Sequence, residues 1–116
     1  MDRTAKNLLL KFGMTFLFAL AALGLFLGNV LSWIILVSLA VTAVNFMLGD
    51  ILILPSFGNV VSAVADGLVA MLVAHVSGVL IFGFRTSGFS LLLFGTLVAI
   101  GEYLLHSYFL NKKDAR

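Results

Sequence analysis

Four apolar runs, each about as long as a helix that crosses a bilayer, occupy most of the 116 residues. They extend over approximately residues 8–27, 30–54, 60–82 and 89–110. Hydrophobic residues make up 62% of the chain and charged residues only 10%, so a water-soluble fold would lack the polar surface it needs. The runs are continuously apolar, without the alternating polarity of barrel strands. We therefore expect one domain over residues 1–116, an all-α, four-helix transmembrane bundle.

The first run also has features of a secretory signal peptide. Arg3, Lys6 and Lys11 stand near its start, and Ala19-Leu20-Ala21 resembles a cleavage site. The apolar run continues to about Leu27, however, and three more runs follow it. We therefore expect the first run to remain as an uncleaved membrane helix.

The basic residues are distributed unevenly around the expected spans. With four spans, the N-terminus, the middle turn and the C-terminus share one side, which carries Arg3, Lys6, Lys11, Lys112, Lys113 and Arg116. The opposite side carries Arg85 alone. This asymmetry predicts that both termini and the middle turn are cytoplasmic. The net charge is only +2, with no basic face outside the membrane, so we expect no nucleic-acid partner.

The segment 49–66 joins the second and third spans and contains the only proline. Pro55 lacks an amide hydrogen and disfavours helix at the residue before it. Together with Gly58 and Asn59 it predicts a turn. Asn59 is also suited to cap the start of the third span.

Small residues recur along each span at spacings of three and four. Helices in lipid gain nothing from burying leucine against leucine, so they associate through small residues and interhelical hydrogen bonds. The first span ends in a G-x-x-x-G pattern made by Gly24 and Gly28. We expect these two glycines to form a packing stripe, either within the bundle or between copies.

Polar side chains gather in the cytoplasmic half of the expected bundle, namely Asn45, Asp50, Asp66, Glu102 and His106. At a rise of about 1.5 Å per residue, Glu102 is about 12 Å and His106 about 6 Å from the end of their span. Asp50 is rotated about 100° from the small-residue stripe of its helix, a position from which it can face the headgroups. A charge at the bilayer centre costs at least about 2.5–3.5 kcal/mol, so these carboxylates need partners such as Lys11.

Two interpretations of this polar group remain open. Glu102 and His106 are one helical turn apart, which suits a proton relay or half of a metal site. The same spacing suits an interhelical hydrogen-bonded pair that only fixes packing. Asp66 and Asp50 can likewise bind a cation or protons, or serve as helix-end residues. No further metal ligand is identifiable, so we predict no metal and no cofactor. His75, in the outer half of the third span, is expected to bond a neighbouring helix.

Several short motifs resemble those of the YndM-like proteins, a domain of unknown function. They are Gly49-Asp50, Ile53-Leu54-Pro55, Gly58-Asn59, Ala65-Asp66, Gly101-Glu102-Tyr103 and His106. The resemblance covers the full length. It implies a small four-span protein in the plasma membrane of endospore-forming Gram-positive bacteria. It implies no substrate, cofactor or mechanism.

Three functions are compatible with these residues. The first is a structural or interaction protein that assembles with itself or with a larger membrane partner. The second is a small proton-coupled transporter or channel, acting as a dimer or larger oligomer through Asp66, Glu102 and His106. The third, an enzyme using the same residues, has little support because no nucleophile motif, phosphate-binding loop or cysteine is present. We expect the first, with the lipid bilayer as its solvent.

Overall fold

The computed structural model describes residues 3–25, 27–81 and 83–114, without the side chains of residues 3, 4, 50 and 109–114. The first membrane helix consists of α1 (Arg3–Ala19), continued by the π-helix η1 (Leu20–Leu25). The second consists of α2 (Leu31–Asn45), the π-helix η2 (Phe46–Ile53) and α3 (Leu54–Phe57). The third is α4 (Asn59–Leu80), and the fourth is α5 (Gly88–Asp114). All four are long and apolar enough to cross a membrane, which confirms the predicted fold class.

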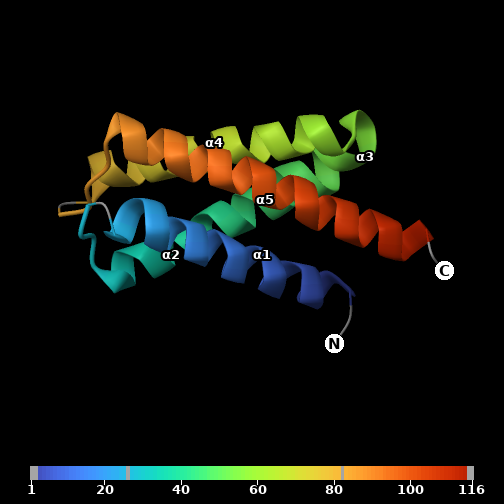
Figure 1. The fold of residues 1–116 in the computed structure, drawn as a ribbon, viewed down its shortest axis with the longest axis horizontal. Coiled ribbons are helices and arrows are strands. Elements are labelled where there is room, and N and C mark those ends of the chain that lie inside the picture. The colour runs from blue at the N-terminus through green and yellow to red at the C-terminus, as the bar shows by residue number, and fades with distance from the viewer. Residues whose placement is uncertain (1–2, 26, 82, 115–116) are drawn as a thin grey trace.

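The four helices form a closed ring of neighbours. α1 packs against α2, α2 against α4, α4 against α5 and α5 against α1, with the most extensive contact between α4 and α5. Figure 1 shows the start of α1, the turn after α3 and the end of α5 at one end of the bundle. The helical ends differ from the expected spans, because helix begins already at Arg3 and continues to Asp114 through the basic tail.

The interior of the bundle has one half that is mainly apolar and one polar half that holds the buried ionisable residues. The apolar half lies away from the termini, and its fully buried residues include Leu23, Ile34, Val41, Ala70 and Phe94. The polar half lies toward the termini, and its buried polar residues include Lys11, Asn45, Ser62, Asp66, Glu102 and His106. Large apolar side chains cover the outside of all four helices, as expected for a surface solvated by lipid.

α4 and α5 touch through glycines in an antiparallel arrangement. A Cβ atom built on Gly67 would lie 2.6 Å from the carbonyl oxygen of Gly95 and 2.9 Å from Cβ of Ala99. A Cβ atom on Gly95 would overlap the side chain of Met71. The two backbones therefore approach each other closely, which positions the polar residues of α4 and α5 on facing surfaces.

The turn between the second and third spans lies at Gly58 and not at Pro55, so the turn prediction was wrong for the proline. Helix continues through Pro55 to Phe57, and Gly58 reverses the chain with a φ of +88°. A proline inside an α-helix clashes with the carbonyl four residues earlier. Here the preceding helix is π-helical, with the Leu54 amide bonded to the carbonyl of Gly49, and this wider spacing accommodates the ring.

Within the chain, the two glycines of the predicted packing stripe have different roles. Gly28 is exposed, has a φ of +70° and would meet no atom within 4 Å of an added Cβ. Its amide bonds the carbonyl of Gly24, so it ends the first helix. Only Gly24 packs, because its Cβ position lies 3.0 Å from Ile34 of α2 in the same chain.

We predict that Gly67→Ala destabilises the bundle by about 1–3 kcal/mol, because the new methyl group meets a backbone carbonyl that cannot rotate away. Gly13→Ala is the matched control, since nothing lies within 4 Å of its Cβ position in the interior of α1. It should be stabilising by about 0.5–1 kcal/mol. Thermal unfolding in detergent measures both variants. Equal melting temperatures would contradict the close α4–α5 contact.

Candidate functional site

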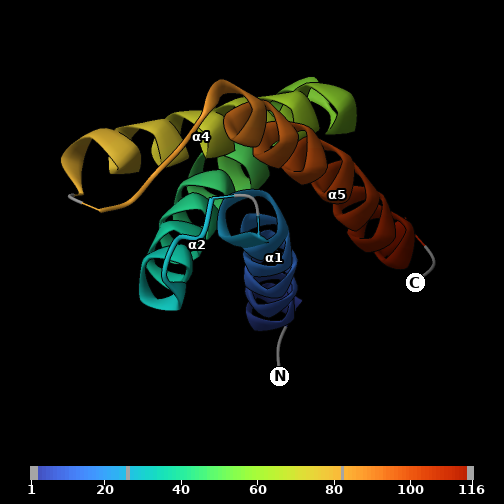
Figure 2. The ribbon, with the colours of Figure 1, turned by 60° about the vertical axis from the view of Figure 1, so that its left-hand side comes forward.

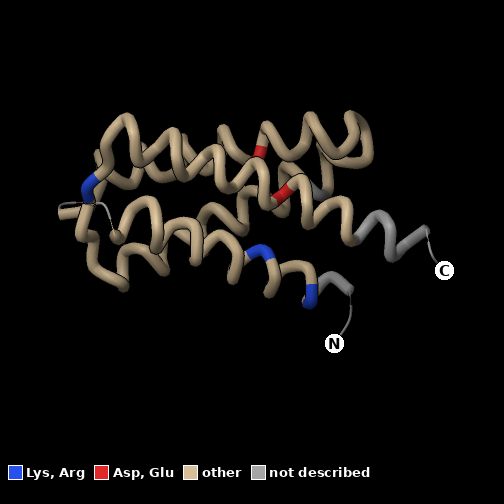
Figure 3. The backbone as a smooth tube through the Cα atoms, viewed as in Figure 1, with Lys and Arg blue, Asp and Glu red and all other residues tan. Residues whose placement is uncertain are grey.

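Four ionisable side chains meet inside the polar half of the bundle. Lys11 comes from α1, Asp66 from α4, and Glu102 and His106 from α5; their exposed fractions are 0%, 1%, 0% and 3%. We call these four residues the ionic cluster. Figure 3 shows basic positions on α1 in the same half of the bundle as the acidic positions on α4 and α5.

Glu102 is the centre of the ionic cluster. Its Oε1 atom accepts a hydrogen bond from Nζ of Lys11 and lies 3.4 Å from Nε2 of His106. Asp66 completes the arrangement, with Oδ2 at 3.5 Å from Nε2 of His106 and at 4.0 Å from Nζ of Lys11. Lys11 and His106 therefore each face both carboxylates, which gives the buried charges partners.

Asn59 orients His106, and the prediction that it caps α4 was wrong. Gly58 precedes α4 as its cap residue, without a side-chain bond. The amide nitrogen of Asn59 instead crosses to α5 and donates to the carbonyl of Tyr103 at 3.1 Å and to Oγ of Ser107 at 2.9 Å. Its Oδ1 atom therefore points at Nδ1 of His106, 2.9 Å away. Because Oδ1 can only accept, the hydrogen lies on Nδ1 of the imidazole.

The hydrogen on Nδ1 leaves Nε2 as the atom of His106 that faces the carboxylates. With a hydrogen fixed on Nδ1, a neutral His106 would present the lone pair of Nε2 to two carboxylate oxygens. That arrangement is repulsive unless Nε2 or one of the carboxyl groups carries a proton. The geometry thus places one proton between His106, Asp66 and Glu102.

The end of α2 and the π-helix η2 that continues it pack against α4 beside Asp66. Nδ2 of Asn45 donates to the backbone carbonyl of Asp66 at 3.3 Å, and Oγ of Ser62 donates to the carbonyl of Gly49 at 3.2 Å. A Cβ atom on Gly49 would lie 2.2 Å from Oδ1 of Asp66. A side chain at position 49 would overlap the Asp66 carboxylate, so glycine is needed where the two helices meet.

Two predicted residues lie outside this arrangement. The side chain of Asp50 is outside the described part of the chain, and its backbone belongs to η2. His75 is exposed on α4, and its side chain makes no hydrogen bond among the described residues. The described helices of this chain therefore do not supply the hydrogen bond that was expected for it.

The donor atoms of Asp66, Glu102 and His106 lie within 4.8 Å of one another, which is close enough to hold a metal ion. The ammonium group of Lys11, however, already faces the carboxylates and bonds Glu102. A divalent cation placed among these donors would face that positive charge at close range. The ionic cluster therefore suits protons better than metal ions.

A family model for a protein of unknown function, DUF2512, matches residues 2–116. The chain belongs to the DUF2512 family. No curated protein and no solved structure matches the chain. The family description assigns no activity, so the function of this DUF2512 protein has to be argued from its own residues.

The structure brings together three members of the predicted polar group, Asp66, Glu102 and His106, and adds Asn59, whose role the sequence prediction missed. Asn59 lies seven residues before Asp66, which is about two helical turns, so both residues share one face of α4. That spacing is a signal for a joint site. The position of Asn59 at the start of the helix equally favours an N-cap role, because asparagine commonly caps helices there.

We predict that Lys11→Met destabilises the protein by about 3–5 kcal/mol, because it leaves two buried carboxylates without their ammonium partner. Adding Glu102→Gln to this variant should recover part of the loss, since one of the two uncompensated charges is then removed. Lys6→Met is the matched control, an exposed lysine of the same helix, and should change stability by less than about 1 kcal/mol. Thermal unfolding in detergent reports all three. A double variant no more stable than Lys11→Met would contradict the pairing.

Proposed function

We propose that this DUF2512 protein is a small, non-enzymatic, proton-coupled transporter of the plasma membrane, with both termini in the cytoplasm. The observation that carries the proposal is the fixed position of His106 between Asn59 and the two carboxylates of Asp66 and Glu102. Ionisable groups inside a membrane bundle are costly, and those that pair internally mark proton and ion pathways.

The charge balance of the ionic cluster supports proton binding. With His106 protonated, the four described side chains of the ionic cluster carry two positive and two negative charges. Losing the proton leaves a net negative charge among groups that are at most 3% exposed. In addition, Oε2 of Glu102 is buried without a hydrogen-bond partner among the described residues, so it offers a second place for the proton.

The surroundings of the ionic cluster support exchange of protons with one side of the membrane. Asn59 and Ser107, which lie between His106 and the end of the bundle that holds the termini, are partly exposed and hydrogen-bonded to each other. In the opposite half the described residues include no buried ionisable side chain, and its largest buried residues are apolar, such as Ile34, Val41 and Phe94. This conformation suits a gated transporter loaded from the cytoplasmic side better than an open channel.

We predict that histidine NMR detects this proton directly. The chain has two histidines, so His75→Gln leaves His106 as the single reporter. In ¹⁵N-histidine-labelled protein, Nδ1 should remain protonated at every pH at which the protein is folded, while Nε2 alternates between protonated and unprotonated forms. Asp66→Asn and Glu102→Gln should each change the pH of that transition. An unprotonated Nδ1 would contradict the assigned orientation.

The same variants separate proton binding from transport. Proteoliposomes containing the wild-type protein should dissipate an imposed pH gradient, followed with an internal pH-sensitive dye. Glu102→Gln and His106→Gln should abolish the flux, and His75→Gln should retain it. Size-exclusion chromatography checks that each variant is folded. Flux that survives in Glu102→Gln would overturn the transport proposal.

A second candidate function, assembly into a homo-oligomer or with a larger membrane partner, is favoured by His75. Its imidazole is exposed in the outer half of α4, where the surrounding solvent is lipid and offers no hydrogen bond. A histidine on a neighbouring copy would supply the missing partner. Assembly and proton coupling are compatible, because His75 is separate from the ionic cluster.

We predict that cysteines near His75 cross-link between copies. The chain has no cysteine, so Val79→Cys introduces the only reactive thiol. Val79 lies one turn after His75 and is 72% exposed. A homobifunctional maleimide should yield dimers in membranes. Leu39→Cys, 51% exposed on α2, is the control and should not. Adding His75→Leu should reduce the dimer yield about threefold or more, as loss of an interhelical bond implies. Equal yields at positions 79 and 39 would contradict assembly through α4.

A further inference from the structure

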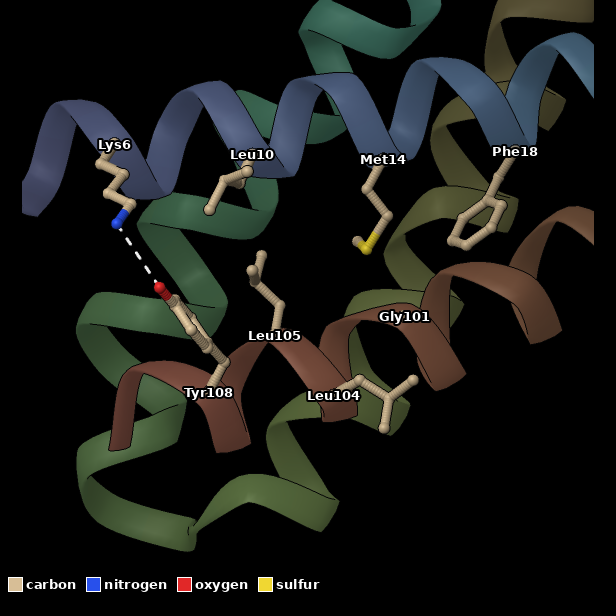
Figure 4. A pocket seen from close by; sticks show the side chains of 8 residues that line it. All are labelled: Lys6, Leu10, Met14, Phe18, Gly101, Leu104, Leu105 and Tyr108. Atoms are coloured by element: carbon tan, nitrogen blue, oxygen red, sulfur yellow. Dashed lines mark hydrogen bonds between the residues drawn. The ribbon is translucent and has the colours of Figure 1, made fainter. Parts of the chain in front are cut away.

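A groove of about 580 Å³ separates α1 from α5 in the half of the bundle that holds the termini. Figure 2 shows the two helices spreading apart toward their free ends, and Figure 4 shows the side chains that line the space between them. On α1 these are Lys6, Leu10, Met14 and Phe18, each one helical turn from the next. The groove therefore runs straight along the axis of α1.

The inner end of the α1–α5 groove is closed by Met14 and Phe18. A Cβ atom on Gly101 would lie 2.6 Å from Sδ of Met14 and 2.6 Å from a ring carbon of Phe18. The two side chains therefore rest on the bare backbone of α5. Toward the termini the groove widens and opens to lipid, since Leu10 is 42% and Leu104 61% exposed.

The outer end of the α1–α5 groove carries its polar atoms. Nζ of Lys6 lies 3.4 Å from the hydroxyl of Tyr108 and 5.7 Å from the centre of its ring. Both residues are exposed. A lysine and a tyrosine at this depth are typical of the headgroup level of a bilayer, where the ammonium attracts anionic lipids.

The dimensions match one leaflet of a bilayer. From Lys6 to Met14, whose side chain closes the inner end, the open part of the groove spans eight residues of helix, or about 12 Å. Half of the hydrocarbon core is about 15 Å thick. A groove that is polar at the headgroup level, apolar below it and open sideways to lipid has the shape of one extended acyl chain with its phosphate at the mouth.

We propose that the α1–α5 groove is a binding site for an anionic phospholipid. Its phosphate lies at Lys6 and Tyr108, and one acyl chain lies along Leu10 and Met14 as far as Gly101. The bound lipid joins α1 to α5 on the face next to the Lys11–Glu102 pair, because Leu10 and Gly101 immediately precede these two residues in the chain. This proposal is independent of proton transport.

Native mass spectrometry of protein stripped of lipid in detergent tests the site. The probes are phosphatidylglycerol and phosphatidylcholine with identical acyl chains. We expect phosphatidylglycerol to be retained more strongly. Lys6→Gln should lower that preference about fivefold, the equivalent of one basic residue at an anionic surface, and Lys6→Arg should preserve it.

Filling the groove supplies the second arm of the test. Leu10→Trp should reduce retention of both lipids, and Leu9→Trp is the matched control, because Leu9 is 59% exposed and does not line the groove. A phosphatidylglycerol with a photoreactive acyl chain should label peptides that contain residues 6–18 and 101–108. Equal retention in the two tryptophan variants, labelling spread over all helices, or dimers that Leu10→Trp dissociates would each overturn the proposal.

Discussion

The hydrogen-bonded ion pair between Lys11 and Glu102 is the contact on which the polar half of the bundle depends. Burial of leucine gives membrane helices no advantage over lipid, so α1 is held to α5 here by polar contact. Neither charge is exposed, and each would be costly alone in a low dielectric. Asp66 and His106 balance the pair, which makes the four charges stable only as a set.

Close backbone packing brings the members of this set together. Gly67 and Gly95 let α4 approach α5, and this contact places Asn59 and Asp66 opposite Glu102 and His106. Gly49, in the widened helix η2, leaves room for the Asp66 carboxylate on the other side. The glycines therefore act mainly within the chain, where they set distances between ionisable groups.

The sequence predicts the fold well because span length and mean composition are sufficient for it. It also predicts that Asp66, Glu102 and His106 face inward, since they lie at or beside stripes of small residues. It fails where the outcome depends on neighbouring segments. Pro55 remains helical because the preceding helix is π-helical, which residue preferences do not indicate.

Asn59 is a further example of the same limit. Its position at the start of a helix favours capping locally, yet three partners on α5 outcompete that role once the helices are packed. The orientation of His106, and with it the position of the shared proton, follows from this one side chain.

The position of the proton also affects how strongly α1 is held to the bundle. If the proton moves from His106 to Glu102, Glu102 loses its negative charge and its attraction for the ammonium group of Lys11 weakens. The position of α1, which packs on α5 less extensively than α4 does, is thereby linked to proton occupancy. A bundle with one closely packed helix pair and one helix held by a titratable contact has the parts that a gated proton site requires.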